Sequence, residues 1–331
     1  MNVAFTPSYG PAAIVELRDA PTPSPGLHEV LIQVHASPVT EGDRRIRSAD
    51  FPGMSALPGR LIMGITGPRR PIGGTMFAGR VVGVGASVKR FAVGDDVFGS
   101  TDDGAYAEYL VAAEDGPIAR MPSNMSYEQA AAVPYGAGTA LYFLQSLAKV
   151  QPGESVLILG ASGGVGRFAV QLAKHLGATV TGVCSAAHMD LVRGLGADHL
   201  IDYRTTDFRS SGTQYDVIFD IADASSFGAC KSSLTSTGRY LTVYMSLDAI
   251  FQTLWTAWGR GAVAKFGLAL PTRDDMEQLR GLIEDGVFPP VIAQRFRLDQ
   301  IVDAHRAVEV SGQAGTVVVS LVGPEPLRAV S

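Results

Sequence analysis

The sequence predicts an α/β protein that combines a doubly wound parallel sheet with a β-rich domain. From residue 155 onward, short apolar runs alternate with amphipathic segments, as in sheets whose parallel strands are connected by helices. Residues 1–125 instead contain short strand-like runs separated by glycine turns, which is typical of a small barrel or sandwich. The third observation is a glycine turn at residues 160–166, which follows the first apolar run of the alternating region.

The N-terminal region contains four segments with the composition of strands. They are Glu29–His35, Gly79–Gly85, Phe91–Gly99 and Ala105–Val111. Between the first two lie residues 51–71, which are rich in glycine and proline yet apolar. Long loops of this kind are often functional. We therefore expect either a lid or wall of a binding site, or a loop that packs on its own domain.

Residues 126–150 change from strands to helices. Ser126 is a suitable N-cap, and Gln129 lies three residues later, where it completes a capping box. Residues 133–140 contain a proline and two glycines, and we expect this run to break the helix. A second helix is expected over Leu141–Leu147.

The glycine turn lies between a strand, Ser155–Leu159, and a helix, Arg167–Leu176, that ends at Gly177. Backbone N–H groups point outward at such a helix start, the helix dipole favours negative charge, and missing side chains let a phosphate approach closely. We expect the turn to bind the diphosphate of a dinucleotide through residues Ser162, Gly163, Gly164 and Val165.

The same turn also fits the nucleophile elbow of an α/β-hydrolase, a G-x-S-x-G motif centred on Ser162. That interpretation needs an acid and a histidine downstream, for which Asp220 or Asp223 and His305 are the candidates. Nothing upstream resembles a glycine-rich oxyanion loop. Gly166 has no role in an elbow, but it permits tight helix–strand packing in a dinucleotide site. The hydrolase is therefore the weaker alternative.

Further strands and helices follow the glycine turn. The expected strands are Thr179–Val183, His199–Ile201, Tyr215–Ile221, Arg239–Val243 and Thr316–Leu321. Amphipathic helices are expected at residues 273–286 and 298–308. Open parallel sheets bind ligands at the carboxyl ends of their strands. This rule assigns Val243, Tyr244 and Met245 to the cofactor site.

The residues after the second strand of the sheet bear on the choice of cofactor. An NAD site usually places Asp or Glu here to bind the ribose 2′-hydroxyl. In this chain no acid occurs between Val183 and Asp190. Because no carboxylate would repel a 2′-phosphate, Ser185 can donate a hydrogen bond to it. The sequence favours NADPH, with NADH as an alternative, and the competing role of Ser185 is to cap the next helix.

Composition excludes several other classes of protein. The net charge is −5 and there is no basic block, so no nucleic-acid partner is expected. The two cysteines argue against a disulfide framework. The N-terminus lacks the features of a signal peptide, and no apolar run approaches the roughly 20 residues that span a bilayer. We therefore expect a cytoplasmic protein without membrane insertion.

Residues 244–264 contain Leu254 and Trp255 among polar residues. A helix on a membrane surface would have such a composition. We favour a helix that is buried at a domain or subunit interface.

A catalytic metal is not expected. A zinc alcohol dehydrogenase needs Cys and His ligands with an open coordination position, and neither cysteine lies in the N-terminal region. His28 and His35 are separated by an odd number of positions, so they would lie on opposite faces of a strand. The sequence also lacks the Tyr-x-x-x-Lys motif of short-chain dehydrogenases.

Several stretches together resemble the zinc-independent medium-chain dehydrogenase/reductases of the quinone oxidoreductase-like branch. The resemblance covers about residues 14–322. The stretches that carry it are residues 34–43, 79–99, 133–140, 160–166, 194–203, 290–292 and 315–318.

The resemblance implies a Rossmann dinucleotide-binding domain, residues 126–264, inserted into a GroES-like catalytic domain formed by residues 1–125 and 265–331. It also implies a cleft between the domains and a homodimer formed through the nucleotide domains. The implied activity is NADPH-dependent hydride transfer to a quinone, an enone or a related conjugated carbonyl. Thr75 follows a glycine where the zinc enzymes carry a ligand histidine, which agrees with a metal-free site.

The resemblance also assigns catalytic roles. Thr40 stands where many relatives carry Asn beside the nicotinamide, and we expect it to hydrogen-bond the substrate carbonyl. Asp43 matches their Asp and is expected to be a structural residue of the turn. Tyr135 is the nearest phenol by motif position, either a proton donor or, as we favour, a wall of the pocket. Arg45 stands where some quinone reductases have Tyr.

Three further residues are assigned to the cofactor by the resemblance. Thr139 matches a threonine near the phosphates or the nicotinamide, and Tyr203 matches a tyrosine near the 2′-phosphate. We expect Phe266 to reach the carboxamide through its backbone. A third class of function stays open, an NADPH-binding redox sensor or scaffold without efficient catalysis, although the intact glycine turn and the large apolar loop favour an enzyme.

Overall fold

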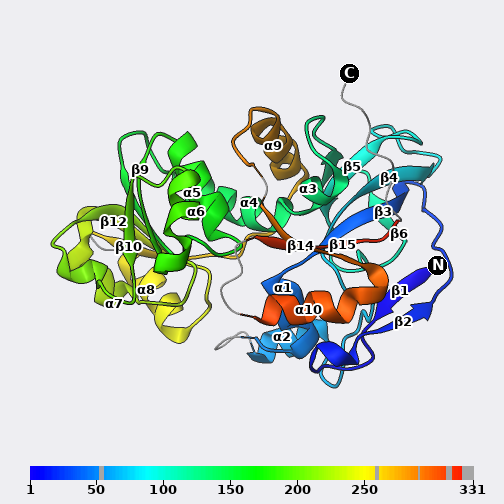
Figure 1. The fold of residues 1–331 in the computed structure, drawn as a ribbon, viewed down its shortest axis with the longest axis horizontal. Coiled ribbons are helices and arrows are strands. Elements are labelled where there is room, and N and C mark those ends of the chain that lie inside the picture. The colour runs from blue at the N-terminus through cyan, green and yellow to red at the C-terminus, as the bar shows by residue number, and fades with distance from the viewer. Residues whose placement is uncertain (52–55, 258–260, 290, 311–314, 323–331) are drawn as a thin grey trace.

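The computed structural model describes residues 1–331 except 52–55, 258–260, 290, 311–314 and 323–331. Figure 1 shows two lobes, one formed by the middle of the chain in green and yellow, the other by its blue and cyan first part and its orange and red last part. The predicted α/β class is confirmed, with a parallel sheet in one lobe and a β-rich fold in the other.

The middle of the chain forms a six-stranded sheet in which every pair of neighbouring strands is parallel. The strand order, β10-β9-β8-β11-β12-β13, is that of a Rossmann fold, with a crevice where the order reverses between β8 and β11. The strands are β8 (Ser155–Leu159), β9 (Thr179–Cys184), β10 (His199–Asp202), β11 (Tyr215–Asp220), β12 (Leu234–Thr242) and β13 (Val263–Phe266). This confirms the predicted doubly wound sheet and adds β13, which we did not expect from the sequence.

Helices cover both faces of this sheet (Figure 1). They are α4 (Pro134–Leu141), α5 (Gly166–His175), α6 (Met189–Gly194), α7 (Phe227–Cys230) and α8 (Leu247–Ala257). Short 3₁₀ turns occur at Ala186–His188, Phe208–Ser210 and Lys231–Ser233. Helix α5 ends as predicted, because Gly177 follows it with a φ of +82° that favours glycine.

The other lobe is built around a seven-stranded sheet with the order β14-β15-β3-β4-β5-β7, and β6 also pairs with β3. The strands are β3 (Glu29–Val39), β4 (Met76–Val84), β5 (Asp96–Ser100), β6 (Tyr109–Ala113), β7 (Ile118–Arg120), β14 (Ile292–Arg297) and β15 (Thr316–Ser320). Strand β15 pairs antiparallel with β3, with Val317 opposite Val39. The last part of the chain therefore extends a sheet that begins near the N-terminus.

The remaining elements surround this second sheet. They are β1 (Asn2–Phe5), β2 (Glu16–Asp19), a 3₁₀ turn (Ala12–Ile14), α1 (Glu41–Ser48), α2 (Ala56–Met63), α3 (Tyr127–Ala131), α9 (Arg273–Glu284), a 3₁₀ turn (Leu298–Gln300) and α10 (Ile301–Glu309). The predicted capping box of Ser126 and Gln129 is confirmed at the start of α3.

The expected break after the helix that starts at Ser126 is present, but it is confined to residues 132–133, and residues 134–140 are helical. Helix α3 ends at Ala131, and α4 begins immediately at Pro134 and runs to Leu141. Pro134 occupies the first turn of α4, where its missing N–H would have no partner and its fixed φ suits a helix. The segment expected as a second α-helix continues α4 as a π-helical turn, Tyr142–Leu147.

The segment of residues 51–71 is not a simple loop, because Ala56–Met63 forms α2. Residues 52–55 of the segment lie outside the described residues. The end of α2 packs on the N-terminal part of its own lobe, since the Tyr9 hydroxyl donates to the Gly64 carbonyl over 2.8 Å. The described residues of the segment do not line the cavity reported below.

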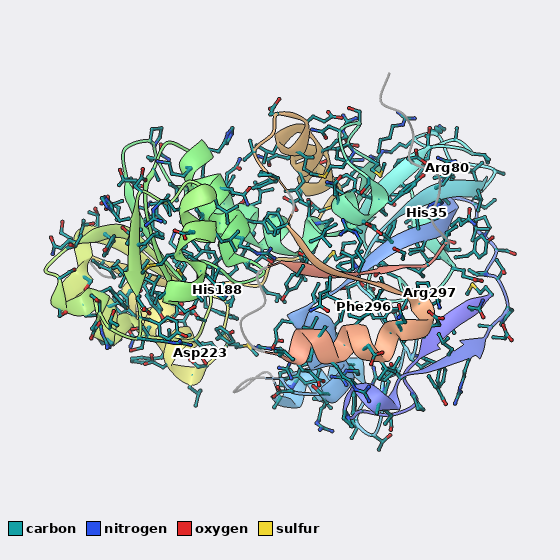
Figure 2. The ribbon with its side chains drawn as sticks, viewed as in Figure 1. His35, Arg80, His188, Asp223, Phe296 and Arg297 are labelled. Atoms are coloured by element: carbon teal, nitrogen blue, oxygen red, sulfur yellow. The ribbon has the colours of Figure 1, made fainter. Side chains whose placement is uncertain are left out.

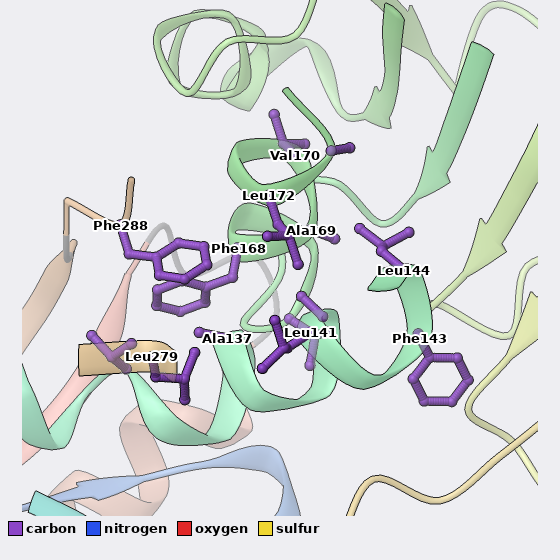
Figure 3. Packing of buried hydrophobic residues seen from close by; sticks show 14 of the residues in the cluster. Ala137, Leu141, Phe143, Leu144, Phe168, Ala169, Val170, Leu172, Leu279 and Phe288 are labelled. Atoms are coloured by element: carbon purple, nitrogen blue, oxygen red, sulfur yellow. The ribbon is translucent and has the colours of Figure 1, made fainter. Parts of the chain in front are cut away.

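The largest hydrophobic cluster joins α4 and α5 to the parallel sheet and to α9. Figure 3 shows the Phe168 ring on α5 beside Phe288, with Ala137 and Leu141 of α4 below it. The Phe168 and Phe288 rings meet edge to face with centroids 5.7 Å apart. This packing fixes the position of α5, and therefore of the glycine turn at its start, relative to α4.

Helix α8 has an exposed apolar side. Leu247, Phe251, Leu254 and Trp255 share one face at spacings of three and four residues, and between 61% and 73% of each is exposed. The opposite face packs on β13, whose Ala264 and Phe266 N–H groups donate to threonine hydroxyls of α8. In the described chain, the helix expected at an interface is thus uncovered.

Candidate cofactor and substrate cleft

A cavity of about 600 Å³ lies between the two lobes. Its walls come from the start of α1, from α4, from the glycine turn, from the ends of β11 and β12, and from the C-terminal segment before β15. The predicted site residues that line it together are Thr40, Tyr135, Thr139, Ser162, Gly163, Gly164, Val165, Val243 and Tyr244. The carboxyl ends of the parallel strands therefore face the second lobe across one space, as expected for this fold.

The glycine turn is shaped by close backbone approaches. Gly160 has a φ of +86°, which a side chain would strain, and its carbonyl accepts from the Gly163 N–H over 3.0 Å. A β-carbon on Gly166 would lie only 2.1 Å from that same carbonyl oxygen. Gly166 is therefore required for close packing of α5 against the turn, the role that we expected for it in a dinucleotide site.

The outer side of the turn is open. A β-carbon on Gly164 would meet nothing within 4 Å, and one on Gly163 would meet only the Gly160 carbonyl. Both glycines are exposed at the start of α5, where the first N–H groups of a helix have no partner within the helix itself. The missing side chains leave a cradle that a ligand of negative charge would fill.

Helix α4 lies directly against this turn. A β-carbon on Gly136 would lie 2.4 Å from the Gly164 carbonyl oxygen and equally near the Phe168 ring. One turn later, the Thr139 hydroxyl donates to the Tyr135 carbonyl over 2.7 Å. Thr139 is thus bonded within its own helix while its side chain lines the cavity.

Arg167 is a buried cation that sequence reasoning missed. It lies on α5, one residue after Gly166, and only 2% of it is exposed. Its nitrogens donate to the Gly163 carbonyl, to the Val291 carbonyl and to the Thr316 hydroxyl over 3.2–3.4 Å. Burial lowers the pKa of Arg167 to about 10. Among the described residues it has no carboxylate partner within 4 Å, so its charge is uncompensated.

Thr40 is the N-cap of α1. Its hydroxyl donates to Asp43 Oδ2 over 2.5 Å, and the Asp43 N–H donates back to Thr40 Oγ1 over 3.2 Å. Thr75 donates to the other carboxylate oxygen of Asp43 over 3.2 Å. Burial raises the pKa of Asp43 against these hydrogen bonds, which lower it. The structural role expected for Asp43 is thus visible as a capping box.

Tyr135, Arg45 and Tyr244 meet at the same end of the cavity. The Tyr135 ring packs against the backbone of Gly42, where a β-carbon would lie 3.2 Å from its Cε2. Burial raises the pKa of Tyr135 to about 12, with a further increase from Asp43, so the phenol keeps its proton near neutral pH. Arg45 Nη2 lies 3.4 Å from the Tyr244 hydroxyl, which in turn donates to the Ile221 carbonyl.

Four predicted cofactor residues lie outside the cavity wall. Met245 and Phe266 are near it, but residues 267–269 rather than Phe266 form the wall after β13. The Phe266 N–H donates to Thr253, so that group is not available to a carboxamide. Ser185 and Tyr203 lie at the ends of β9 and β10, which are neighbouring strands. Val308, Val310 and Thr316 also line the cavity, and only the folded chain brings them there.

Ser185 and Tyr203 belong to a polar corner beside the parallel sheet. The Ser185 hydroxyl lies 3.2 Å from His188 Nδ1 and does not cap the following turn. Tyr203 is 59% exposed, and the Arg204 guanidinium lies 5.7 Å from its ring centroid. The alternative role of Ser185 as a helix cap is therefore wrong, and its hydroxyl is directed to a titratable ring.

The residues proposed for a hydrolase do not assemble. Asp220 is buried and accepts from the backbone of residues 222–225 and from the Tyr240 hydroxyl. His305 lies in the other lobe, edge to face with Tyr106. The structure gives Ser162 no hydrogen bond to a histidine within the described parts of the chain, so the elbow lacks its base.

In the described part of the chain, no three His, Cys, Asp or Glu residues are grouped so that they could hold a metal ion. Figure 2 places His188 in the lobe of the parallel sheet and His35 in the other lobe. His35 stacks on Tyr127 with ring centroids 4.0 Å apart. No described helix is long and apolar enough to cross a membrane.

Comparisons with known proteins agree over the whole length of the chain. Residues 26–123 match the family described as Alcohol dehydrogenase GroES-like domain, and residues 195–319 match Zinc-binding dehydrogenase. The chain is 30% identical to the chloroplast envelope quinone oxidoreductase homolog of Arabidopsis thaliana, over 94% of this chain and 96% of that protein.

Two solved structures extend this likeness to the fold. The quinone oxidoreductase from Coxiella burnetii is 28% identical with a TM-score of 0.82, covering 97% of this chain and 99% of that one. A mycobacterial protein complexed with NADPH is 25% identical with a TM-score of 0.80, covering 97% and 100%.

Proposed function

We propose that this chain is an NADPH-dependent reductase of quinones, enones or related conjugated carbonyls that works without a metal. The premise is that the chain belongs to the medium-chain dehydrogenase/reductase family and is related to quinone oxidoreductases. The observation that carries the proposal is the open glycine cradle, which faces a cavity shared by both lobes. The quinone oxidoreductase relatives and the NADPH-bound neighbour support the choice of chemistry.

The cradle has the shape and charge that a dinucleotide needs. The turn at Gly163 and Gly164 would hold the diphosphate at the start of α5, because neither glycine places a side chain in that space. Arg167 supplies a buried positive charge beside the same turn. Two independent features therefore fit an anion at this point.

The choice of NADPH over NADH rests on the corner beside β9. Ser185, His188 and Tyr203 are polar groups at the ends of β9 and β10, and Arg204 adds a positive charge. These side chains can donate hydrogen bonds to a 2′-phosphate, and no acidic residue directly after β9 would repel it. These groups support NADPH, with NADH as the alternative.

The bound nicotinamide would supply the hydride, and the chain's own residues bind, orient and exclude water. Thr40 lines the cavity near Tyr135, where a carbonyl can accept its hydroxyl. The Thr40 hydroxyl, which donates to Asp43 in the structure, would turn to the carbonyl and stabilise the charge that develops there. Tyr135 forms a wall of the pocket, and solvent can protonate the product.

Consumption of NADPH, followed by its near-ultraviolet absorbance with quinones, enones and aldehydes in the presence of EDTA, tests this function. We expect turnover with at least one conjugated carbonyl, unchanged by EDTA. The variant Gly164→Val should keep its melting temperature and lose NADPH binding, because the added side chain occupies only the cradle. No consumption of NADPH with any compound of the panel, together with tight NADPH binding, would instead support a redox sensor. Inhibition by EDTA would contradict a metal-free site.

The proposed assembly is a homodimer formed through the parallel-sheet domains. Strand β13 is an edge of the described sheet, and the exposed apolar face of α8 lies beside it. A second copy would cover the apolar face of α8, which is how large apolar patches are usually protected.

A further inference from the structure

Charged side chains are rare in the cavity wall. Among the described residues that line it, only Glu41, Arg45 and Arg167 carry charge. The remaining wall is apolar or neutral, so water inside is poorly placed to screen charge. The site therefore has two cations against one anion before any ligand enters.

The two cations lie on different elements and face different parts of the cavity. Arg167 is bonded to the glycine turn through the Gly163 carbonyl, which places it at the proposed diphosphate. Arg45 lies on α1 with Thr40 and contacts Tyr244, and it acts electrostatically on Tyr135. Arg45 is therefore the cation at the end where a reducible carbonyl would bind.

Arg45 is held in position with donors to spare. Its Nε donates to Glu41 Oε1 over 2.9 Å, one helical turn earlier, and its guanidinium carbon lies 5.2 Å from the Tyr244 ring centroid. With a side chain 26% exposed, it is pinned at its base while its tip lines the cavity. Within the described chain, Nη1 makes no hydrogen bond, so an edge of the planar fork is left for a ligand.

Glu41 does not fully compensate this charge. Its carboxylate also accepts two hydrogen bonds from Arg44, over 2.8 and 2.7 Å, so one anion serves two guanidinium groups. Asp50 lies 2.9 Å from Arg44 and is largely exposed. Asp43 is the other carboxylate nearby, and its oxygens accept from Thr40 and Thr75 rather than from Arg45. Among the described residues, the Arg45 guanidinium thus keeps an unpaired edge on the cavity side of α1.

We propose that Arg45 selects substrates that carry a carboxylate in addition to the conjugated carbonyl. The proposal rests on the reductase function proposed above and names its substrate class. A planar guanidinium and a carboxylate form paired, charge-assisted hydrogen bonds, which are stronger in a cavity than in water. Binding the acid at Arg45 would fix the double bond between Thr40 and the nicotinamide, so the charge acts as a positioning group.

The test compares an unbranched enone that ends in a carboxylate with its methyl ester, which keeps the same reducible group. We expect the wild-type protein to favour the acid in kcat/KM by at least about tenfold. Arg45→Met should lower kcat/KM for the acid by about 10- to 100-fold, the range for loss of a charge-assisted contact. It should change the ester by less than about threefold. Arg45→Lys should recover part of the preference.

Arg44→Met is the matched control, because Arg44 shares Glu41 and does not line the cavity. It should leave the preference for the acid unchanged. Equal losses for acid and ester in Arg45→Met would overturn the proposal, since they would show a general effect on the carbonyl. A wild-type protein that prefers the ester would overturn it as well.

Binding measured without turnover separates this proposal from the reductase function. Calorimetric titration of the saturated acid and its ester into the protein with NADP⁺ should show tighter binding of the acid, lost in Arg45→Met and reduced by salt. If no substrate is turned over but this pattern is found, the reductase function fails and the acid site stands. If turnover occurs and acid and ester bind equally, the acid site fails and the reductase stands.

Discussion

A β-carbon on Gly136 would lie 2.4 Å from the carbonyl oxygen of Gly164, so α4 and the glycine turn meet with no space for a side chain. This contact joins the helix that carries Tyr135 and Thr139 to the turn that would hold the diphosphate. The substrate wall and the cofactor cradle are therefore parts of one packed unit.

Replacing Gly136 should test that contact. Gly136→Ala is expected to destabilise the fold by about 1–3 kcal/mol, because an overpacked core must shift backbone as well as side chains. Gly138→Ala is the control on the same helix, since its β-carbon would meet only a leucine methyl at 4.0 Å. Urea unfolding should show the first variant weakened and the second unchanged or stabilised, and equal effects would contradict the packing argument.

Loss of the buried cation should weaken dinucleotide binding at its diphosphate. Arg167→Met is expected to raise the Kd of NADPH and of NADH by a similar factor, about 10- to 100-fold, because both share that group. Adenosine 2′-monophosphate, which lacks the diphosphate, should bind the variant as it binds the wild type. If the fragment lost affinity as well, Arg167 would be a structural residue alone.

The site is expected to act by orientation rather than by acid–base catalysis. Thr40→Val and Tyr135→Phe should each lower kcat by less than about a thousandfold. Thr40→Val should also cost about 1 kcal/mol of stability, because it removes the cap of α1. Since the pKa of Tyr135 is raised to about 12, the rate should show no tyrosine ionisation between neutral pH and about pH 10. A larger loss of kcat would identify a proton donor.

His305 should make stability depend on pH in the acid range. Burial and, to a smaller extent, the positive charge of Arg47 lower the pKa of His305 to about 3. Below about pH 6.5 the imidazole is therefore protonated in the unfolded chain but stays neutral in the folded chain. The contribution of His305 to the free energy of unfolding is consequently lost as pH falls from 6.5 towards 3.

The variant His305→Leu isolates that effect. The difference in unfolding free energy between wild type and variant should change by up to about 1.4 kcal/mol per pH unit in this window. The contributions of the buried acids Asp43 and Asp220 cancel in this difference, because both proteins contain them. Their raised pKa values would make stability increase as pH falls, which is opposite to the effect of His305. Parallel stability curves would show that His305 is not buried in its neutral form.

The apolar face of α8 should decide the oligomeric state. Trp255→Glu is expected to convert a dimer to a monomer in size-exclusion chromatography with light scattering, because it places a charge in the buried interface. Val93→Glu is the control, an apolar residue of the other lobe that is 63% exposed. A wild-type protein that elutes as a monomer would contradict the proposed assembly.

Local patterns predicted those features that depend on neighbouring residues. The order strand, glycine turn and helix identified the cradle, and the need for Gly166 followed from packing within a few residues. The same rules were right only in part at residues 133–140, because the helix break is limited to its start and the proline and glycines lie within α4. Their actual roles are to start α4 and to allow its contact with Gly164, which is not local in the sequence.

Features made by distant segments could not be predicted. The Arg167 guanidinium is held by hydrogen bonds to Val291 and Thr316, which lie more than a hundred positions away in the sequence. Strand β13 is only four residues long, which is too short for a strong periodic pattern. Two of its N–H groups donate to hydroxyl groups of α8, a contact between segments that the sequence pattern does not reveal. The apolar face of α8, which we expect to be covered at an interface, is exposed in the described chain, and a single sequence does not show what covers it.

The pairing of β3 with β15 imposes an order on biosynthesis. Strand β3 leaves the ribosome well before its neighbour β15, and the whole parallel-sheet lobe is made between them. At about 5–20 residues per second, Ala36–Val39 of β3 must wait for tens of seconds without the partner that β15 provides, while the parallel-sheet lobe can fold. An interruption of synthesis before β15 would thus release a chain with an intact nucleotide fold and an exposed end of β3.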